Sequence, residues 1–211
     1  MPTTPLPIPP GPYKAYLFDL DGTVADSMPL HFVAWSKAVS EAGGQFPEPL
    51  FYQMGGIPLH RTVELLNERF NTTMDPAAVV HYKENLYLDM LPNLKPVASV
   101  LAHIEAQSGK MPFAIVSGSP RASIHATLAQ LGLAHHFPVI VGAEDYAHGK
   151  PNPEPFLKAA ALLQVKPKDC LVFEDADAGI ESAKAAGMDW VRIPAPTPAS
   201  SLSYFPTSRP K

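Results

Sequence analysis

Five short, nearly continuous apolar runs are spaced along the chain, separated by longer stretches in which apolar and polar residues mix. The runs cover residues 15–20, 113–116, 138–141, 170–173 and 190–193. Continuous rather than alternating hydrophobicity is typical of strands that are buried on both faces, as in a parallel sheet. The pattern therefore predicts five buried parallel strands.

Most of the intervening stretches carry apolar residues at helical spacing. One helix is predicted to follow Ser119 and Pro120, which suit the N-cap and the first helical position. Further apolar stripes lie at 97–104, 156–163 and 180–183. Alternation of strands and helices favours an α/β fold, with a Rossmann-like three-layer α/β/α core built on a parallel sheet.

The stretch from residue 28 to residue 91 breaks this alternation, because it contains no convincing strand. Its three predicted helices cover 30–42, 59–70 and 75–90. An insertion of this length is too long for a simple loop. We therefore expect an α-helical cap domain at 28–91, inserted into a catalytic core formed by residues 13–27 and 92–195.

Proline is concentrated at the two ends of the chain. The sequence has 25 prolines, and many of them fall within residues 1–12 and 196–211. Proline has no backbone N–H to donate and favours extended geometry. We therefore predict a Pro-rich tail at 1–12 and a Pro/Ser-rich tail at 196–211.

Composition and charge narrow the class of protein. Hydrophobic residues make up 46% of the chain and charged residues 17%, as in globular proteins. A net charge of −4 offers no basic surface for nucleic acid or an anionic membrane. The single cysteine, Cys170, excludes an internal disulfide and multi-thiolate zinc sites. We expect a cytoplasmic monomer that binds neither nucleic acid nor membrane.

Acidic side chains follow two of the predicted strands, at the sheet edge where α/β proteins bind ligands. Asp19 and Asp21 are two residues apart at the end of the first strand, so both carboxylates can face one site. Glu174 and Asp175 end the fourth strand. Four converging acids repel one another, and a hard cation relieves the conflict. Mg²⁺, held by one or two carboxylates and phosphate oxygens, fits best.

Groups that suit an anion follow other strands. Ser117 and Gly118 offer a hydroxyl and backbone N–H groups just before a helix. Lys150 also precedes a helix and can place a positive charge on a phosphate. Lys150 taken alone is more typical of a solvated loop lysine, so the evidence lies in the combination of these groups.

These strand ends, in order D-x-D-G-T, S-G-S, K-P and E-D, resemble the haloacid dehalogenase (HAD) superfamily of phosphotransferases. The similarity extends from Tyr13 to Ile193 and includes the predicted cap. Within the superfamily, FDLDGTVADSMPLHFVAW, GKPNPEPF and FEDADAGIESAKAAGM are similar to stretches of β-phosphoglucomutases and fructose-1-phosphate phosphatase-like sugar phosphatases.

The resemblance implies a role for each core residue. Asp19 would be the nucleophile that becomes an aspartyl phosphate, and Asp21 the general acid/base. The implied Mg²⁺ ligands are Asp19, Asp21 through its carbonyl, Glu174 and Asp175. The implied phosphate-binding residues are Ser117, Gly118 and Lys150.

The predicted cap is expected to select the substrate. The substrate-binding candidates are His31, Arg61, Lys83 and Arg121. His31 lies in the sequence HFVAW and could hydrogen-bond a sugar or Asp21, and Lys83 matches a cap lysine of the mutases. For each candidate, an ordinary packing or surface role remains an open alternative.

The resemblance implies an HAD-type phosphoric monoester hydrolase, a Mg²⁺-dependent phosphatase that hydrolyses a small phosphorylated sugar through an aspartyl phosphate. The alternative is a phosphohexomutase of the β-phosphoglucomutase type. The mutases hold a second phosphate with an arginine where this chain has Leu59, and the nearest arginine is Arg61. Loss of that anchor favours hydrolysis. A signalling receiver domain is disfavoured, because it has no helical insertion after its first strand.

Overall fold

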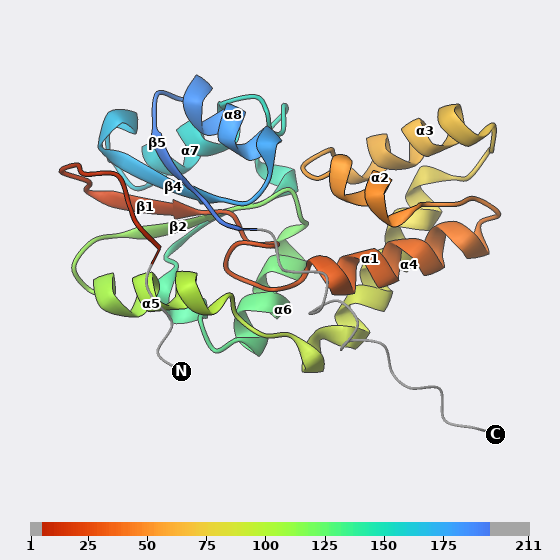
Figure 1. Ribbon diagram of the computed structural model, residues 1–211, viewed down its shortest axis with the longest axis horizontal. Coiled ribbons are helices and arrows are strands. Elements are labelled where there is room, and N and C mark those ends of the chain that lie inside the picture. The colour runs from red at the N-terminus through yellow and green to blue at the C-terminus, as the bar shows by residue number, and fades with distance from the viewer. Residues whose placement is uncertain (1–5, 195–211) are drawn as a thin grey trace.

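The computed structural model of the protein describes residues 6–194, and Figure 1 shows their arrangement. Most of the two predicted tails lies outside this range. All five predicted strands are present and form one parallel sheet in the order β3-β2-β1-β4-β5. The strands are β1 (Ala15–Phe18), β2 (Phe113–Val116), β3 (Val139–Val141), β4 (Cys170–Glu174) and β5 (Asp189–Arg192).

The first strand ends two residues earlier than the pattern predicts. β1 stops at Phe18, and the carbonyl of Leu20 accepts hydrogen bonds from the amides of Val24 and Ala25 at 3.0 and 2.9 Å. These bonds begin a turn at the carboxyl end of the strand. Asp21 therefore lies in a turn, so the turn and not strand alternation sets the direction of its side chain.

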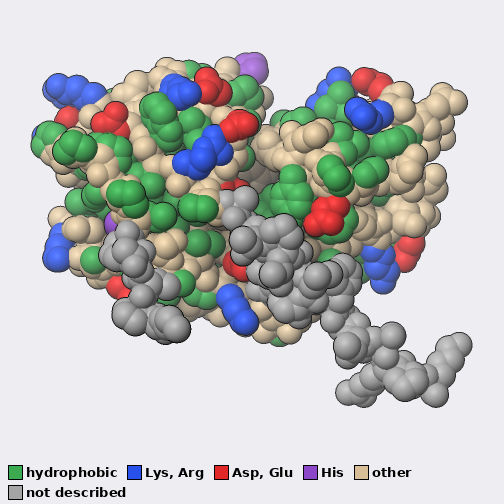
Figure 2. Space-filling model, viewed as in Figure 1, with side chains coloured by type: hydrophobic (Ala, Val, Ile, Leu, Met, Phe, Trp, Pro, Cys, Tyr) green, Lys and Arg blue, Asp and Glu red, His purple; other side chains and the backbone are tan. Residues whose placement is uncertain are grey.

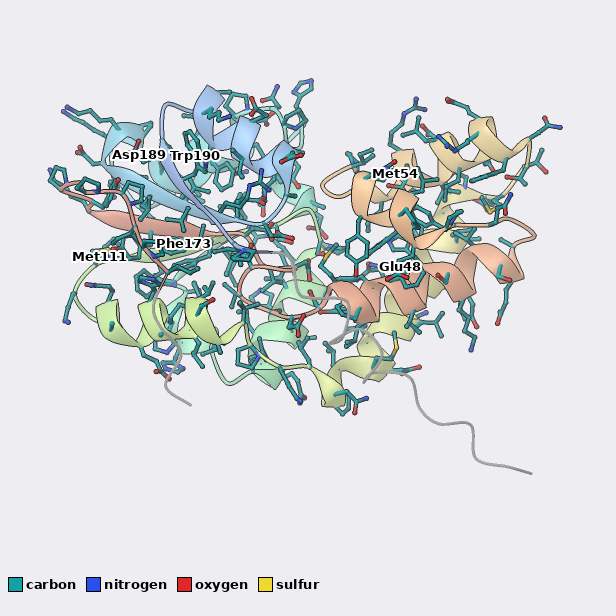
Figure 3. All side chains as sticks on the ribbon, in the orientation of Figure 1. Glu48, Met54, Met111, Phe173, Asp189 and Trp190 are labelled. Carbon is teal, nitrogen blue, oxygen red and sulfur yellow. The ribbon has the colours of Figure 1, made fainter. Side chains whose placement is uncertain are left out.

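Helices cover both faces of the sheet (Figure 1). They are α5 (Ala98–Gln107) and α6 (Arg121–Gln130) on one face, and α7 (Glu154–Leu162) and α8 (Asp177–Ala185) on the other. Successive strand residues point to opposite faces. Tyr16 and Phe18 accordingly pack toward α5 and α6, whereas Ala15 and Leu17 pack toward α7 and α8. Phe173 of β4 lies between the sheet and α5 (Figure 3). The predicted three-layer α/β/α core is confirmed.

A group of helices follows β1 and lies beside the sheet (Figure 1). It consists of α1 (Met28–Glu41), α2 (Glu48–Gln53), α3 (Leu59–Phe70) and α4 (Pro76–Met90). An apolar core of its own holds the group together, and Trp35, Phe46, Phe51, Val63 and Leu66 belong to that core. The inserted helical cap is therefore present, and its exact domain boundaries, 28–91, stay a prediction.

Two details of the helices differ from the sequence-based prediction. The prediction of three cap helices was wrong, because α2 has only 6 residues and is too short to show a helical period. The helix predicted to begin at Pro120 starts at Arg121 instead, with Pro120 at the N-cap position. The hydroxyl of Ser119 donates to Asp21 rather than capping that helix. By contrast, Asp75, the first residue of the segment predicted to be helical at 75–90, caps α4 by accepting the amide of Ala77 at 2.9 Å.

Short 3-10 turns connect several elements, at Leu91–Asn93, Ala134–His136, Ala143–Asp145 and Pro167–Asp169. None of the helices within residues 6–194 combines the length and hydrophobicity needed to cross a membrane.

Candidate active site

A cavity of about 130 Å³ lies at the carboxyl end of β1, between the sheet and the helical cap. In Figure 2 the surface is notched between these two parts of the molecule. The core contributes polar side chains to the lining, including Asp19, Asp21 and Lys150. The cap contributes mainly apolar and aromatic ones, including Trp35 and Phe51. One end of the cavity is therefore highly charged and the other is largely apolar.

Lys150 forms the centre of the charged end. Its ammonium lies 2.6 Å from Asp19 Oδ1, 2.6 Å from Glu174 Oε1 and 3.0 Å from the carbonyl oxygen of Val116. Burial alone would lower the pKa of Lys150, but the carboxylates of Asp19 and Glu174 outweigh burial and raise it. The lysine therefore stays positively charged next to Asp19.

Asp19 is itself buried among other acids. Burial raises the pKa of its carboxyl group, Lys150 opposes the rise, and the negative charges of Glu174 and Asp175 add to it. An aspartate in this setting is poorly hydrated, so few water molecules compete for its oxygen atoms. That environment suits a carboxylate that acts as a nucleophile.

Asp21 is held by hydrogen bonds to both of its oxygen atoms. Oδ1 accepts from the hydroxyl of Ser27 at 2.7 Å and from Nε2 of His31 at 2.8 Å. Oδ2 accepts from the hydroxyl of Ser119 at 2.8 Å and more weakly from that of Ser117 at 3.4 Å. Burial would raise the pKa of Asp21, but His31, Ser27 and Ser119 together lower it. This arrangement holds Asp21 as a carboxylate.

His31 connects the cap to this aspartate. Its ring stacks on Tyr87 of α4, with ring centroids 4.0 Å apart and an angle of 15° between the planes. Because the Asp21 carboxylate can only accept, Nε2 of His31 carries the proton of this bond. The other ring nitrogen, Nδ1, is buried and has no hydrogen-bond partner within residues 6–194. The sequence left two hydrogen-bond partners open for His31, a sugar or Asp21. The structure brings His31 to Asp21.

Two glycines allow the acidic side chains to approach the chain closely. Gly22 has a φ of +87°, and a Cβ at this position would overlap the carboxylate of Asp175. A Cβ at Gly179 in α8 would overlap the carboxylate of Glu174. That carboxylate also accepts the amide of Ala176 at 2.8 Å. Glycine is therefore required at both positions for the acids to reach the site.

The predicted phosphate-binding segment opens onto the cavity. Ser117 and Gly118 both line it. A Cβ at Gly118 would meet no atom within 4 Å, so the backbone there borders open space. The hydroxyl of Tyr146, which the sequence analysis did not single out, donates to the carbonyl of Ser117 at 3.1 Å. That bond fixes the backbone of the segment.

The acids of the site have the chemistry that Mg²⁺ requires. Within residues 6–194, no three His, Cys, Asp or Glu side chains form a ready metal-ligand group. However, the Lys150 ammonium pairs directly with two of the four carboxylates, those of Asp19 and Glu174, and burial followed by the charge of Glu174 raises the pKa of Asp175 to about 7. A divalent cation would relieve this repulsion. Mg²⁺ needs only one or two protein carboxylates, so Asp19, Asp175 and the carbonyl of Asp21 fit it.

The four substrate-binding candidates divide into two pairs. Lys83 lines the cavity, as His31 does. Arg61 lies outside it, where its guanidinium pairs with Glu64 and Glu68 of the same helix at 2.9 and 3.0 Å. Arg121 also lies outside, paired with Asp145 at 2.7 Å. The structure therefore brings His31 and Lys83 to the site and leaves the two arginines at the surface.

Several site residues were not recognised from the sequence. Ser27 lies at the N-cap position of α1, and it makes no capping bond, because its hydroxyl is used by Asp21. Ser119 lies one residue before the N-cap of α6, and its hydroxyl also donates to Asp21. Both lie next to helix starts, where serine is expected for local reasons. The only additional signal was their closeness in sequence to the two motifs that carry Asp21 and Ser117.

Comparison with known proteins agrees with this geometry. The family model of haloacid dehalogenase-like hydrolases matches residues 13–187. Fructose-1-phosphate phosphatase YqaB of Escherichia coli (strain K12) is 35% identical over 181 residues, which cover 86% of this chain and 96% of that protein. β-Phosphoglucomutase of Bacillus subtilis (strain 168) is 31% identical over 187 residues, covering 83% and 80%.

A solved structure shows the same fold. The crystal structure of β-phosphoglucomutase from Clostridium difficile matches with a TM-score of 0.77 at 26% identity, covering 85% of this chain and 84% of that one. The parallel sheet and the inserted helical cap thus recur together. The chain therefore belongs to the haloacid dehalogenase-like hydrolase family and is an HAD-type phosphoric monoester hydrolase.

Proposed function

We propose that this enzyme is a Mg²⁺-dependent phosphatase that hydrolyses a small phosphorylated sugar, a hexose or ketose monophosphate, through an aspartyl phosphate on Asp19. The observation that carries the proposal is that Asp19 and Asp21 line one small cavity together with Lys150 and the cap residue His31. The similarity to the E. coli fructose-1-phosphate phosphatase supports the same substrate class.

The reaction would use the carboxylates in two steps. An oxygen of Asp19 attacks the phosphorus, the bond to the sugar oxygen breaks, and Asp21, which carries the proton gained in the preceding turnover, passes it to that oxygen. In the second step Asp21 takes a proton from water, the water oxygen attacks the phosphorus, and Asp19 leaves as inorganic phosphate forms. The hydrogen bonds from Ser27, Ser119 and His31 stabilise the carboxylate form of Asp21, which is the form that the second step needs.

The remaining core residues would bind the phosphoryl group. The ammonium of Lys150 lies next to Asp19, where it can hold a phosphoryl oxygen as charge moves during transfer. The hydroxyl of Ser117 and the backbone at Gly118 border the same space. Mg²⁺, held by Asp19, Asp175 and the carbonyl of Asp21 with Glu174 nearby, would neutralise charge on the transferring group.

The alternative is a phosphohexomutase, and the similarity to β-phosphoglucomutases supports it as a second candidate. A mutase must retain a bisphosphate and so needs a second anion site. Leu59 lines the cavity, whereas Arg61 and Arg121 pair with acids outside it. This distribution of charge favours hydrolysis. The monomeric state and the cytoplasmic location expected from the sequence are part of the same proposal.

The experiment is a hydrolysis screen. The purified enzyme is incubated with hexose and ketose monophosphates in the presence of Mg²⁺, and released inorganic phosphate is measured. We expect turnover of at least one of these sugars, loss of activity with excess chelator, and recovery when Mg²⁺ is added back. Full activity in excess chelator would contradict the dependence on Mg²⁺. Absence of turnover on every sugar phosphate would contradict the proposed substrate class.

A further inference from the structure

Lys83 is an unusual cation for a substrate pocket, because it is almost completely buried. Its side chain is 1% exposed, and it lines the cavity from the cap helix α4. The ammonium lies 5.6 Å from the ring centroid of Trp35 and 5.6 Å from that of Tyr87. Aromatic faces stabilise a cation only partly, so a buried ammonium also needs a counter-charge.

That counter-charge is Glu84, the next residue in the helix. Glu84 Oε1 accepts a hydrogen bond from the Lys83 ammonium at 2.6 Å. The other carboxylate oxygen, Oε2, accepts from the hydroxyl of Ser123 in the core helix α6. Adjacent helical residues do not normally face each other. The pair therefore depends on the packing of α4 against α6, and both oxygens of Glu84 are fixed.

Glu84 is ionised at neutral pH. Burial alone would raise its pKa, but the Lys83 ammonium and the Ser123 hydroxyl outweigh burial and lower it. The positive charge of Lys83 is therefore balanced before any substrate enters.

The positive charge of the other lysine that lines the cavity is also balanced by carboxylates. Lys150 pairs with Asp19 and Glu174. Of the residues described, no arginine lines the cavity. The part distant from Asp19 is formed largely by Trp35, Phe51 and other apolar side chains. A second anionic group placed there would lose its hydration without meeting an uncompensated positive charge.

We propose that Glu84 determines substrate specificity: by neutralising Lys83, it restricts the site to phosphomonoesters whose remaining part is uncharged. Lys83 then donates hydrogen bonds to sugar hydroxyl groups instead of binding a second phosphate or a carboxylate. The inference rests on the proposed phosphatase function and names the class of substrate more narrowly.

The test compares a sugar monophosphate with its bisphosphate. Initial rates of phosphate release give kcat/KM for fructose 1-phosphate and fructose 1,6-bisphosphate, with Mg²⁺ and at one ionic strength. We expect the wild-type enzyme to prefer the monophosphate. Glu84→Gln keeps the shape of the side chain and removes its charge, so the ratio should shift toward the bisphosphate by about tenfold. Lys83→Met should not produce this shift, because it removes the cation that the second phosphate would use.

Glu64→Gln is the matched control. It makes the same chemical change in another cap helix, where the carboxylate pairs with Arg61 outside the cavity. The ratio should stay at the wild-type value. Thermal unfolding of each variant verifies folding, and the wild-type ratio tests the proposal even if Glu84→Gln does not fold.

The outcomes separate this inference from the proposed function. If the wild-type enzyme hydrolyses neither sugar phosphate nor any other sugar monophosphate, the proposed function fails. If it hydrolyses monophosphates but accepts the bisphosphate equally well, the role of Glu84 is overturned and the phosphatase stands. A folded Glu84→Gln variant with an unchanged ratio would also overturn it.

Discussion

The hydroxyl of Tyr87 lies 2.7 Å from Oγ1 of Thr127, and this buried hydrogen bond joins the cap helix α4 to the core helix α6. The same tyrosine ring stacks on His31, whose Nε2 bonds Asp21. Tyr87 and His31 thus link this contact between core and cap to Asp21, the proposed acid/base. The position of His31 over Asp21 depends on how α4 packs on α6.

The first prediction concerns this hydrogen bond. Tyr87→Phe and Thr127→Val should each lower the free energy of unfolding by about 1 kcal/mol, because each leaves one buried hydroxyl without its partner. The double variant should be less destabilised than the sum of the two, since neither hydroxyl then remains. Urea unfolding of the four proteins measures the coupling. Strict additivity would show that the bond contributes nothing to stability.

The strand ends were the most predictable part of the structure. Asp19, Ser117 and Glu174 lie at the carboxyl ends of β1, β2 and β4, and Lys150 lies in the loop after β3. A parallel sheet brings the carboxyl ends of its strands to one edge. The order of these residues along the chain was therefore enough to predict which side chains lie together at the carboxyl edge of the sheet. The alternation of strands and helices predicted the layers for the same reason.

Side-chain partners were harder to predict, because they depend on packing between distant segments. Ser119 was assigned to a helix cap, yet the tertiary bond to Asp21 replaces the local one. Pairing of Lys83 with Glu84 could not be expected from helical spacing. Arg61 is different. Its partners Glu64 and Glu68 are three and seven residues further along the helix, so the spacing itself contained a signal for a surface ion pair.

The second prediction concerns the nucleophile. Asp19→Asn should lower kcat at least about a thousandfold, because an amide cannot form the acyl phosphate. Circular dichroism and thermal unfolding should show that the fold is retained. Asp89→Asn, which changes an exposed carboxylate of α4, should leave kcat unchanged. Substantial turnover by a folded Asp19→Asn enzyme would remove Asp19 from the mechanism.

A third prediction concerns the close contact between α8 and Glu174. Alanine is favoured over glycine in a helix by about 1 kcal/mol, but a Cβ at Gly179 would overlap the Glu174 carboxylate. Glu174 cannot move without breaking its bonds to Lys150 and to the amide of Ala176. Gly179→Ala should therefore lower the free energy of unfolding by about 1–3 kcal/mol and also reduce kcat.

Gly187→Ala provides the comparison for this variant. Gly187 has a φ of +71°, and a Cβ there would meet no atom within 4 Å. Its replacement should cost about 1 kcal/mol of stability through backbone strain alone, with no change in kcat. A stabilised and fully active Gly179→Ala enzyme would show that Glu174 is free to move.

The fourth prediction is a pH dependence of stability. The pKa of Glu84 is lowered from its ordinary value of 4.5, so the folded protein binds this proton less tightly than the unfolded chain. The resulting stabilisation is complete above the unfolded-state pKa and is lost as the pH falls through the folded-state pKa. The difference in unfolding free energy between wild type and Glu84→Gln should therefore shrink below about pH 4. A difference that stays constant down to pH 3 would contradict the assignment.

The fifth prediction separates hydrolase from mutase. Both reactions would use Asp19 and Asp21, and they differ in whether water or a sugar hydroxyl attacks the aspartyl phosphate. The enzyme is given β-glucose 1-phosphate with a trace of the 1,6-bisphosphate, and inorganic phosphate and glucose 6-phosphate are followed together. We expect phosphate without accumulation of glucose 6-phosphate. Faster formation of glucose 6-phosphate would establish the mutase instead.

Measuring how tightly Leu59→Arg binds the 1,6-bisphosphate tests whether a missing cation at residue 59 distinguishes this site from that of a mutase. Leu59 begins α3 and lines the cavity, at the position where the resemblance to the mutases places an arginine. A guanidinium there can bind a second phosphate in bidentate fashion, so the variant should bind the 1,6-bisphosphate about tenfold more tightly. Leu59→Met conserves the volume without adding charge and should behave like the wild type. If Leu59→Arg folds and its affinity for the bisphosphate is unchanged, a missing cation at residue 59 is not what distinguishes this site from a mutase.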